Sequence, residues 1–161
     1  MNRVVLFVCT GNVCRSPMAQ ALFAAHARRV GDGDLFTVQS AGTWAPDNQH
    51  ASGHAITVMA RRGIDIARHR ARTITRREMD QADVIIVMTR SHREALAAEF
   101  PEHRPKLHML SELRNRLYDI PDPYGGTLKE YEFTAQEIEK LVDEGYAKIK
   151  SWATNTDAPA S

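Results

Sequence analysis

The residue types best suited to chemistry lie together near the N-terminus. The segment reads Cys9-Thr10-Gly11-Asn12-Val13-Cys14-Arg15-Ser16. It follows an apolar run at residues 4–8 and precedes helix-forming sequence, so its backbone N–H groups are expected to converge on one spot that favours an anion. Gly11 and Asn12 tolerate left-handed backbone, and the planar guanidinium of Arg15 can hold two phosphate oxygens. We call residues 9–16 the phosphate loop.

Cys9, the first residue of the phosphate loop, is the candidate nucleophile. A helix N-terminus and a nearby arginine both favour the thiolate, which is the reactive form of cysteine. The alternative is that Cys9 is a small buried hydrophobic residue at the end of a strand, as most free cysteines are. The glycine, asparagine and arginine at this spacing favour the first interpretation, a phosphate-binding cup with a nucleophile at its base.

Composition excludes several other classes of protein. The 161 residues are 43% hydrophobic and 25% charged, which is typical of one folded domain and not of a disordered or collagen-like chain. The net charge of +1 argues against a nucleic-acid partner, and no apolar run approaches the length of a membrane helix. The first apolar stretch is too short for a signal peptide. With only Cys9 and Cys14 as thiols, we expect a cytoplasmic protein without a zinc site.

Strand-like and helix-like segments alternate along the chain. Strands are predicted at residues 4–8, 35–40, 83–88 and 106–110, and helices at 16–29, 50–62, 91–99 and 128–149. This order predicts an α/β fold: a doubly wound, four-stranded parallel sheet with helices on both faces and flavodoxin-like strand order. Ser16 is expected to cap the first helix, with Pro17 at its first position.

The last predicted helix and the residues after it complete the domain. Its expected apolar side consists of Phe133, Ile138, Leu141, Val142 and Tyr146. We expect one domain over residues 1–150 and a disordered tail over residues 151–161, which are small and polar.

Two motifs in this order resemble the low-molecular-weight protein tyrosine phosphatases. The first is Cys-x5-Arg-Ser directly after the first strand, within Val-Leu-Phe-Val-Cys-Thr-Gly-Asn-Val-Cys-Arg-Ser-Pro-Met-Ala. The second is the late Asp122-Pro123-Tyr124. The resemblance covers residues 4–149, and the combination of both motifs is far more specific than Cys-x5-Arg alone.

The resemblance implies a reaction that needs no metal or other cofactor. Cys9 would attack phosphorus and form a phosphocysteine, while Arg15 binds the phosphoryl oxygens. Asp122 would protonate the leaving oxygen and then activate water. Asp119 is a rival acid, but the family pattern places the acid directly before Pro-Tyr. Because Pro123 has no N–H, we also expect the Asp122 carboxyl to lack a nearby donor and to stay protonated more easily.

The resemblance further implies residues that bind the substrate or shape the loop. Substrate-binding positions are expected at Thr10, Gly11, Asn12, Val13, Cys14, Ser16, Trp44 and Tyr124, the last two as aromatic walls. Ser16 would hydrogen-bond the thiolate, an alternative to its capping role. Ser40 and His69, with Asn12, would hold the loop in shape. Cys14 matches the family's second loop cysteine and is expected to trap oxidised Cys9 in a disulfide.

The sequence defines the leaving group of the substrate less sharply than it defines the attack by Cys9. Gly125-Gly126 and Thr89 resemble the protein-arginine phosphatase branch of the family, whereas that branch typically has threonine where this chain has Val13. We predict a phosphotyrosine-containing protein substrate, with phosphoarginine as the alternative. An arsenate reductase would need cysteines after Cys14, and the chain has none. A non-catalytic phosphate-binding module is the remaining alternative. A monomer is expected.

Overall fold

Four parallel strands form the centre of the molecule. The computed structural model describes residues 2–155. The strands are β1 (Arg3–Cys9), β2 (Phe36–Gly42), β3 (Val84–Val87) and β4 (Leu107–Met109). Their order in the sheet is β2-β1-β3-β4, and each neighbouring pair is parallel. The predicted doubly wound sheet and its strand order are therefore confirmed.

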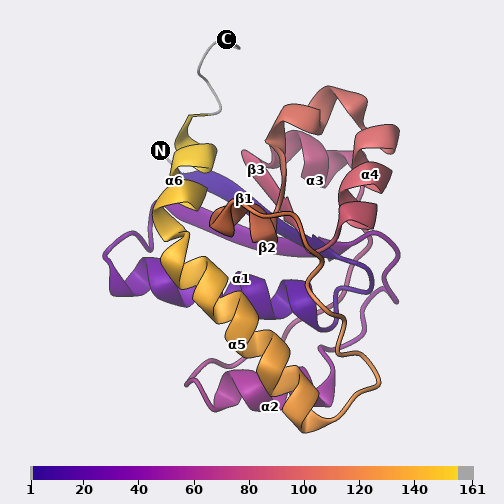
Figure 1. Cartoon of the computed structure of the whole chain (residues 1–161), viewed down its shortest axis with the longest axis vertical. Coiled ribbons are helices and arrows are strands. Elements are labelled where there is room, and N and C mark those ends of the chain that lie inside the picture. Colours follow the sequence, from indigo (N-terminus) through magenta and orange to yellow (C-terminus); the bar gives the residue numbers. More distant parts are fainter. Residues whose placement is uncertain (1, 156–161) are drawn as a thin grey trace.

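Helices cover both faces of this sheet (Figure 1). One face carries α1 (Arg15–Arg29), α2 (Gly53–Ala60), α5 (Leu128–Glu144) and α6 (Tyr146–Thr154). The other carries α3 (Arg76–Gln81) and α4 (Arg90–Glu99). Two short 3₁₀ helices, η1 (Pro101–Lys106) and η2 (Leu110–Arg114), flank β4.

The central strand β1 explains why its sequence is an unbroken apolar run. Val5 and Phe7 face the layer of α1 and α5, whereas Leu6 and Val8 face the layer of α3 and α4. All four side chains are completely buried. A strand buried on both faces has no solvated side on which a polar residue would be favoured.

The first helix begins two residues earlier than the predicted cap and first position. Cys14 is its N-cap and Arg15 its first residue, so the predicted capping role of Ser16 is wrong. The Ser16 side chain is fully buried and makes hydrogen bonds inside the phosphate loop. Pro17 takes the third helical position, where the missing N–H costs nothing because the first turn has no intrahelical acceptor.

The second helix is shorter than the predicted 50–62. Before it begins at Gly53, the backbone around Gln49 pairs with residue 71: Asn48 N–H donates to Ala71 O, and Ala71 N–H donates to Gln49 O. Ser52 N–H donates to Val13 O in the phosphate loop. These tertiary hydrogen bonds hold residues 48–52 in non-helical backbone.

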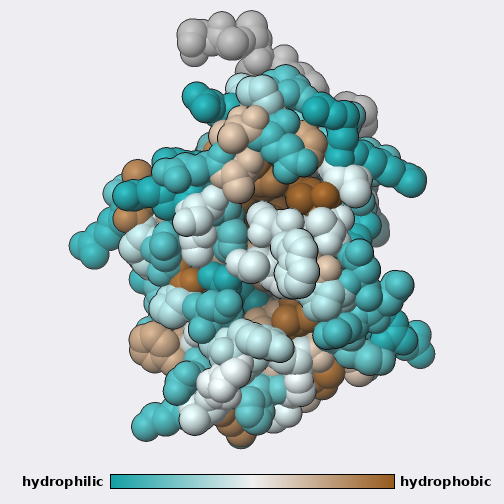
Figure 2. Space-filling view, turned by 90° about the vertical axis from the view of Figure 1, so that its right-hand side faces the viewer, coloured by the Kyte–Doolittle hydropathy of each residue, from teal (hydrophilic) through white to brown (hydrophobic). Residues whose placement is uncertain are grey.

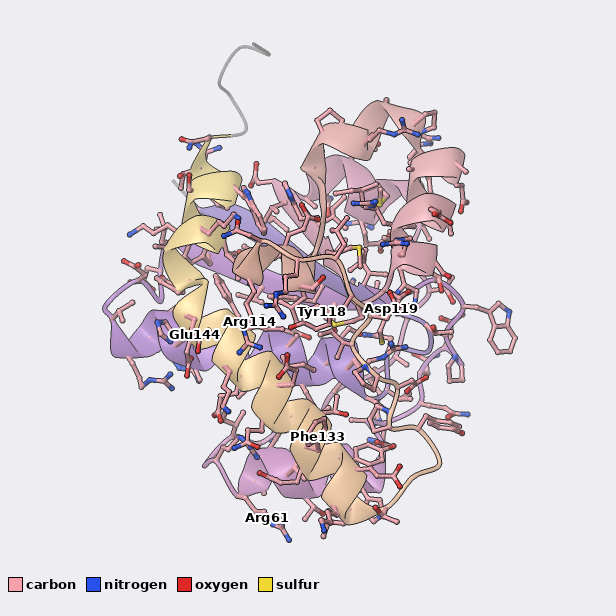
Figure 3. All side chains as sticks on the ribbon, in the orientation of Figure 1. Arg61, Arg114, Tyr118, Asp119, Phe133 and Glu144 are labelled. Atoms are coloured by element: carbon pink, nitrogen blue, oxygen red, sulfur yellow. The ribbon has the colours of Figure 1, made fainter. Side chains whose placement is uncertain are left out.

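The long C-terminal helix is divided at Gly145, where α5 ends and α6 begins. Phe133 stands on the outer side of α5 in Figure 3 and is 66% exposed, so its predicted place on the apolar side is wrong. Tyr131, two residues earlier, is buried instead.

Helix α6 runs through Thr154, so the predicted boundary at residue 150 falls inside a helix. Residues 156–161 of the predicted tail lie outside the described residues.

The registers of β1 and β2 bring the ends of both strands to one edge of the sheet. Cys9 is opposite Gly42, and the phosphate loop leaves β1 at this point before α1 begins. In doubly wound sheets ligands bind beyond the carboxyl ends of the strands. Between residues 2 and 155, no helix combines the length and apolarity that crossing a membrane requires.

Candidate active site

A cavity of about 310 Å³ opens at the carboxyl end of β1. Residues of the phosphate loop form its base, and later loops form its walls. It is lined by Cys9, Thr10, Gly11, Val13, Cys14, Arg15, Trp44, Pro46, Gln49, Asp122 and Tyr124. Figure 2 shows this side of the molecule, where residues of intermediate hydropathy gather in the middle and strongly hydrophobic ones form only small separate areas.

The Cys9 thiol lies at the base of this cavity and is 2% exposed. Its Sγ is 2.9 Å from Ser16 Oγ, and Asn12 Nδ2 donates to the same Ser16 oxygen at 2.8 Å. Ser16 Oγ also lies 3.4 Å from Ala41 O, so its proton has two possible acceptors, this carbonyl and the Cys9 sulfur.

Asn12 determines the shape of the phosphate loop. It is fully buried and has a φ of 56°, in the left-handed region. Its Nδ2 also donates to Ser40 Oγ at 3.0 Å, and its Oδ1 accepts from Arg72 N–H at 3.0 Å. These contacts offset the cost of left-handed backbone, which asparagine tolerates better than most residues.

His69 holds the backbone of Asn12 through a hydrogen bond. Its Nε2–H donates to the Asn12 carbonyl at 2.7 Å, which places the ring proton on Nε2. Burial, followed by the positive charge of Arg72, lowers the pKa of His69 below its ordinary value. The neutral ring keeps this single hydrogen bond. Neither His69 nor Ser40 lines the cavity, as expected for residues that shape the loop.

Arg15 is 3% exposed, and its guanidinium is held from two directions. Nη1 donates to Ile120 O at 2.9 Å, and Nη2 lies 3.4 Å from Asp122 Oδ2. Its Nε is buried without a hydrogen-bond partner among residues 2–155. A buried N–H donor without a partner is costly, and an oxyanion in the cavity would satisfy it.

The contacts of Asp119 and Asp122 distinguish the two candidates for the catalytic acid. Asp119 Oδ1 accepts from Arg90 N–H at 2.9 Å, beside the first turn of α4 (Figure 3). Asp122 lines the cavity with a side chain that is 48% exposed. The expectation that Asp122 lacks a donor is wrong, because Tyr124 N–H donates to its Oδ1 at 3.1 Å. The chain turns back at Pro123, so the next N–H reaches the carboxylate.

The expected substrate-binding residues divide into two groups. Val13, Trp44 and Tyr124 line the cavity, and the two aromatic rings are mostly exposed at its rim. The side chains of Asn12 and Ser16 do not line it, because both are fully buried behind the loop. Pro46 and Gln49 also line the cavity, and no sequence signal distinguishes them from other loop residues.

Comparisons with known proteins agree with this geometry. Residues 4–153 match the family model described as low molecular weight phosphotyrosine protein phosphatase. This chain belongs to that family.

Relatives within this phosphatase family differ in the substrate that their names state. The chain is 36% identical to a protein-arginine-phosphatase of Bacillus subtilis, over 91% of this chain and 96% of the relative. It is 35% identical to a probable low molecular weight protein-tyrosine-phosphatase, EpsP, of Ralstonia nicotianae, over 94% of this chain and 99% of the relative.

A solved structure of this phosphatase family has the same architecture. It is a cysteine-to-serine mutant of the arginine phosphatase YwlE with a phosphorylated active-site serine. The TM-score is 0.86 at 35% identity, and the match covers 91% of this chain and 95% of that one.

The second thiol of this phosphatase, Cys14, is in a different environment from Cys9. Its Sγ lies 3.2 Å from Tyr131 Oη and 3.4 Å from Ser52 Oγ. Burial raises the pKa of Cys14, and burial likewise raises the pKa of Tyr131 to about 12. Cys14 is therefore a protonated thiol at neutral pH. The sequence gives no signal for Tyr131, which α5 brings in from 117 residues away.

Gly42 of this phosphatase is a second residue important for the site that the sequence analysis does not predict. A Cβ atom at this position would lie 2.3 Å from Thr10 O and 3.1 Å from Asn12 N. Only glycine allows β2 to approach the phosphate loop so closely. A glycine two residues after the predicted strand 35–40 is the signal that could have indicated it.

Proposed function

We propose that this protein hydrolyses phosphotyrosine in protein substrates through a phosphocysteine intermediate. The observation that carries the proposal is the convergence of Cys9, Arg15 and Asp122 on one cavity. A nucleophile, an oxyanion donor and a proton source within one site are what a phosphoryl transfer to cysteine requires.

In the first step, the Cys9 thiolate attacks phosphorus and forms the S–P bond. The bond from phosphorus to the phenolic oxygen breaks, and the carboxyl of Asp122 gives its proton to that oxygen. The partnerless Nε of Arg15 and the backbone N–H groups of the phosphate loop stabilise the charge on the phosphoryl oxygens. The phosphorylated active-site serine of the YwlE mutant supports a phosphorylated enzyme residue as the intermediate in this fold.

In the second step, water hydrolyses the phosphocysteine. The carboxylate of Asp122 takes a proton from the water, whose oxygen bonds to phosphorus. The S–P bond breaks, inorganic phosphate leaves, and the sulfur returns as a thiolate. The Ser16 hydroxyl, 2.9 Å from this sulfur, stabilises the leaving thiolate in this step.

The assay is hydrolysis of p-nitrophenyl phosphate by the wild type and two variants. Cys9→Ser should abolish turnover and retain phosphate binding, because a phosphoserine formed there would have no thiolate leaving group and would not be hydrolysed. Asp122→Asn should lose the alkaline limb of the pH profile. Measurable turnover by Cys9→Ser would mean that another nucleophile operates, and an unchanged alkaline limb would remove Asp122 as the acid.

Phosphotyrosine is favoured over phosphoarginine by the walls of the cavity. The methyl groups of Val13 suit a phenyl ring, and Trp44 and Tyr124 offer stacking surfaces at the rim. A guanidinium would leave donors unsatisfied against Val13. Phosphoarginine is the second candidate because Gly125-Gly126 follow Tyr124 and a relative is named an arginine phosphatase.

The ratio of kcat/KM on the two phosphorylated peptides decides between these substrates. Val13→Thr should shift the ratio toward phosphoarginine, because threonine keeps the shape of valine and adds an acceptor. A wild type that already favours phosphoarginine would overturn the choice of phosphotyrosine and leave the proposed chemistry intact.

We further propose that oxidation regulates the enzyme. Peroxide converts the Cys9 thiolate to a sulfenic acid, and the Cys14 thiol attacks that sulfur, forms a disulfide and releases water. Support comes from the two thiols, which are both free and both line the same cavity. Two free thiols also suit a cytoplasmic location, and the proposed unit is a monomer.

A further inference from the structure

His92 in the first turn of α4 touches the phosphate loop from behind. The residue is 6% exposed, and its Nε2 lies 2.8 Å from Thr10 Oγ1. Thr10 is the residue directly after the nucleophile Cys9. The contact joins two segments that are 82 residues apart in the sequence.

The Thr10 hydroxyl links this histidine to the guanidinium of Arg15. Arg15 Nη2 donates to Thr10 Oγ1 at 3.5 Å, and the same nitrogen lies 3.4 Å from Asp122 Oδ2. A continuous series of polar contacts therefore runs from the His92 ring through Thr10 to Arg15 and Asp122. Displacement of the Thr10 hydroxyl would remove one of the contacts that orient Nη2.

The backbone that carries His92 is itself fixed. His92 N–H donates to Thr89 Oγ1 at 3.1 Å, which caps α4, and Asp119 accepts from Arg90 N–H at the same helix end. A buried ring on a capped helix turn has little freedom to move, because the surrounding side chains restrict its rotation. It is therefore suited to hold a loop residue in one position.

The ring makes no other polar contact within residues 2–155 that could explain its burial. Its Nδ1 is buried without a hydrogen-bond partner. Burial, followed by the charge of Arg15, lowers the pKa of His92 to about 4, while Asp119 and Asp122 act in the opposite direction. The ring is thus neutral at neutral pH and adds no charge beside Arg15. An apolar residue would be cheaper to bury here.

We propose that His92 is a positioning residue that orients the Thr10 hydroxyl and, through it, the Arg15 guanidinium for binding the phosphoryl group. Its effect on turnover rests on the proposed function. Its effect on binding of inorganic phosphate does not, because that measurement needs no catalysis.

The first experiment compares two substitutions at His92. His92→Leu removes the contact with Thr10, so the inhibition constant of inorganic phosphate should rise and kcat/KM on p-nitrophenyl phosphate should fall, each about tenfold. His92→Gln places a polar atom at about the reach of Nε2 and should restore both values to within about twofold of wild type. Equal losses in both variants would overturn the proposal.

A double-mutant cycle tests whether His92 acts through Thr10. Thr10→Val removes the hydroxyl at nearly constant shape. If the chain of contacts operates, the Thr10→Val/His92→Leu double variant should bind phosphate about as weakly as the weaker single variant. Additive losses would mean that the two residues act independently, and the proposal would fail.

A matched control separates positioning from stability. His108 is a half-buried histidine of β4 that stacks on Trp152 at 3.8 Å between ring centroids, away from the cavity. His108→Leu should lower the melting temperature and leave phosphate affinity unchanged. If His92→Leu behaves in the same way, its role is only structural. If wild type binds phosphate but does not turn over, the proposed function fails while the binding comparison still decides the role of His92.

Discussion

Gly42→Ala should disable the active site although residue 42 takes no part in the chemistry. Gly42 ends β2 opposite Cys9, and its N–H and C=O bond to Arg72 O and Ile74 N–H on the other side. A Cβ added here would lie 2.3 Å from Thr10 O and 3.1 Å from Asn12 N. Both neighbours are backbone atoms of the phosphate loop, so no side-chain rotation relieves the clash.

The size of the effect follows from these distances. Real Cβ atoms essentially never approach closer than 3.0 Å, so β2 and the loop must separate by at least about 0.7 Å. Two hydrogen bonds resist this movement, from Thr43 N–H to Cys9 O at 2.9 Å and from Trp44 N–H to Thr10 O at 3.0 Å. Misplacement of this order around a reacting centre costs about a hundredfold in rate.

The assay is kcat/KM on p-nitrophenyl phosphate, with the inhibition constant of phosphate and the melting temperature measured in parallel. We expect kcat/KM to fall by about a hundredfold, and overpacking to destabilise the fold by about 1–3 kcal/mol. Gly53→Ala is the matched control, because a Cβ at Gly53 in α2 meets nothing within 4 Å. If Gly42→Ala retains wild-type kcat/KM, the loop is not held against β2 as described.

Three further substitutions test the site. Arg15→Lys loses both the partnerless Nε and the Nη1 bond to Ile120 O, so kcat/KM should fall at least about a hundredfold; a loss of less than about tenfold would contradict the role of the planar guanidinium. His92 has a pKa of about 4 in place of 6.5, so the unfolded chain takes up its proton first as the pH falls. The free energy of unfolding should then drop by about 2 kcal/mol more in wild type than in His92→Gln between about pH 7.5 and about pH 5, measured by urea denaturation, and equal slopes would refute this. After peroxide treatment, dithiothreitol should restore activity much less in Cys14→Ser than in wild type, and equal recovery would exclude a resolving role.

Local sequence was enough to predict the sheet and the phosphate loop. The apolar run of β1, the polar loop after it and the helix that follows are adjacent in the chain, so their order alone places Cys9 and Arg15 at a helix N-terminus. Burial on both faces leaves a clear signature in a strand, and the alternation of strands and helices restricts the topology to a few arrangements. The late Asp-Pro-Tyr motif located Asp122 only through the resemblance to a family.

The tertiary structure decided which polar side chains meet. Ser16 has the residue type of a helix cap, yet its hydroxyl contacts Cys9 and Asn12, and the helix begins at Arg15. The contact between His92 and Thr10 and the approach of Gly42 to the loop join segments that are distant in sequence. Such contacts depend on how strands and helices are packed, and a pattern of neighbouring residues carries no information about atoms that only folding brings within 3 Å. The sequence therefore predicted Cys9 as the nucleophile and located its loop, and the contacts of Asn12 together with the packing of β2 and α4 decided the shape of that loop.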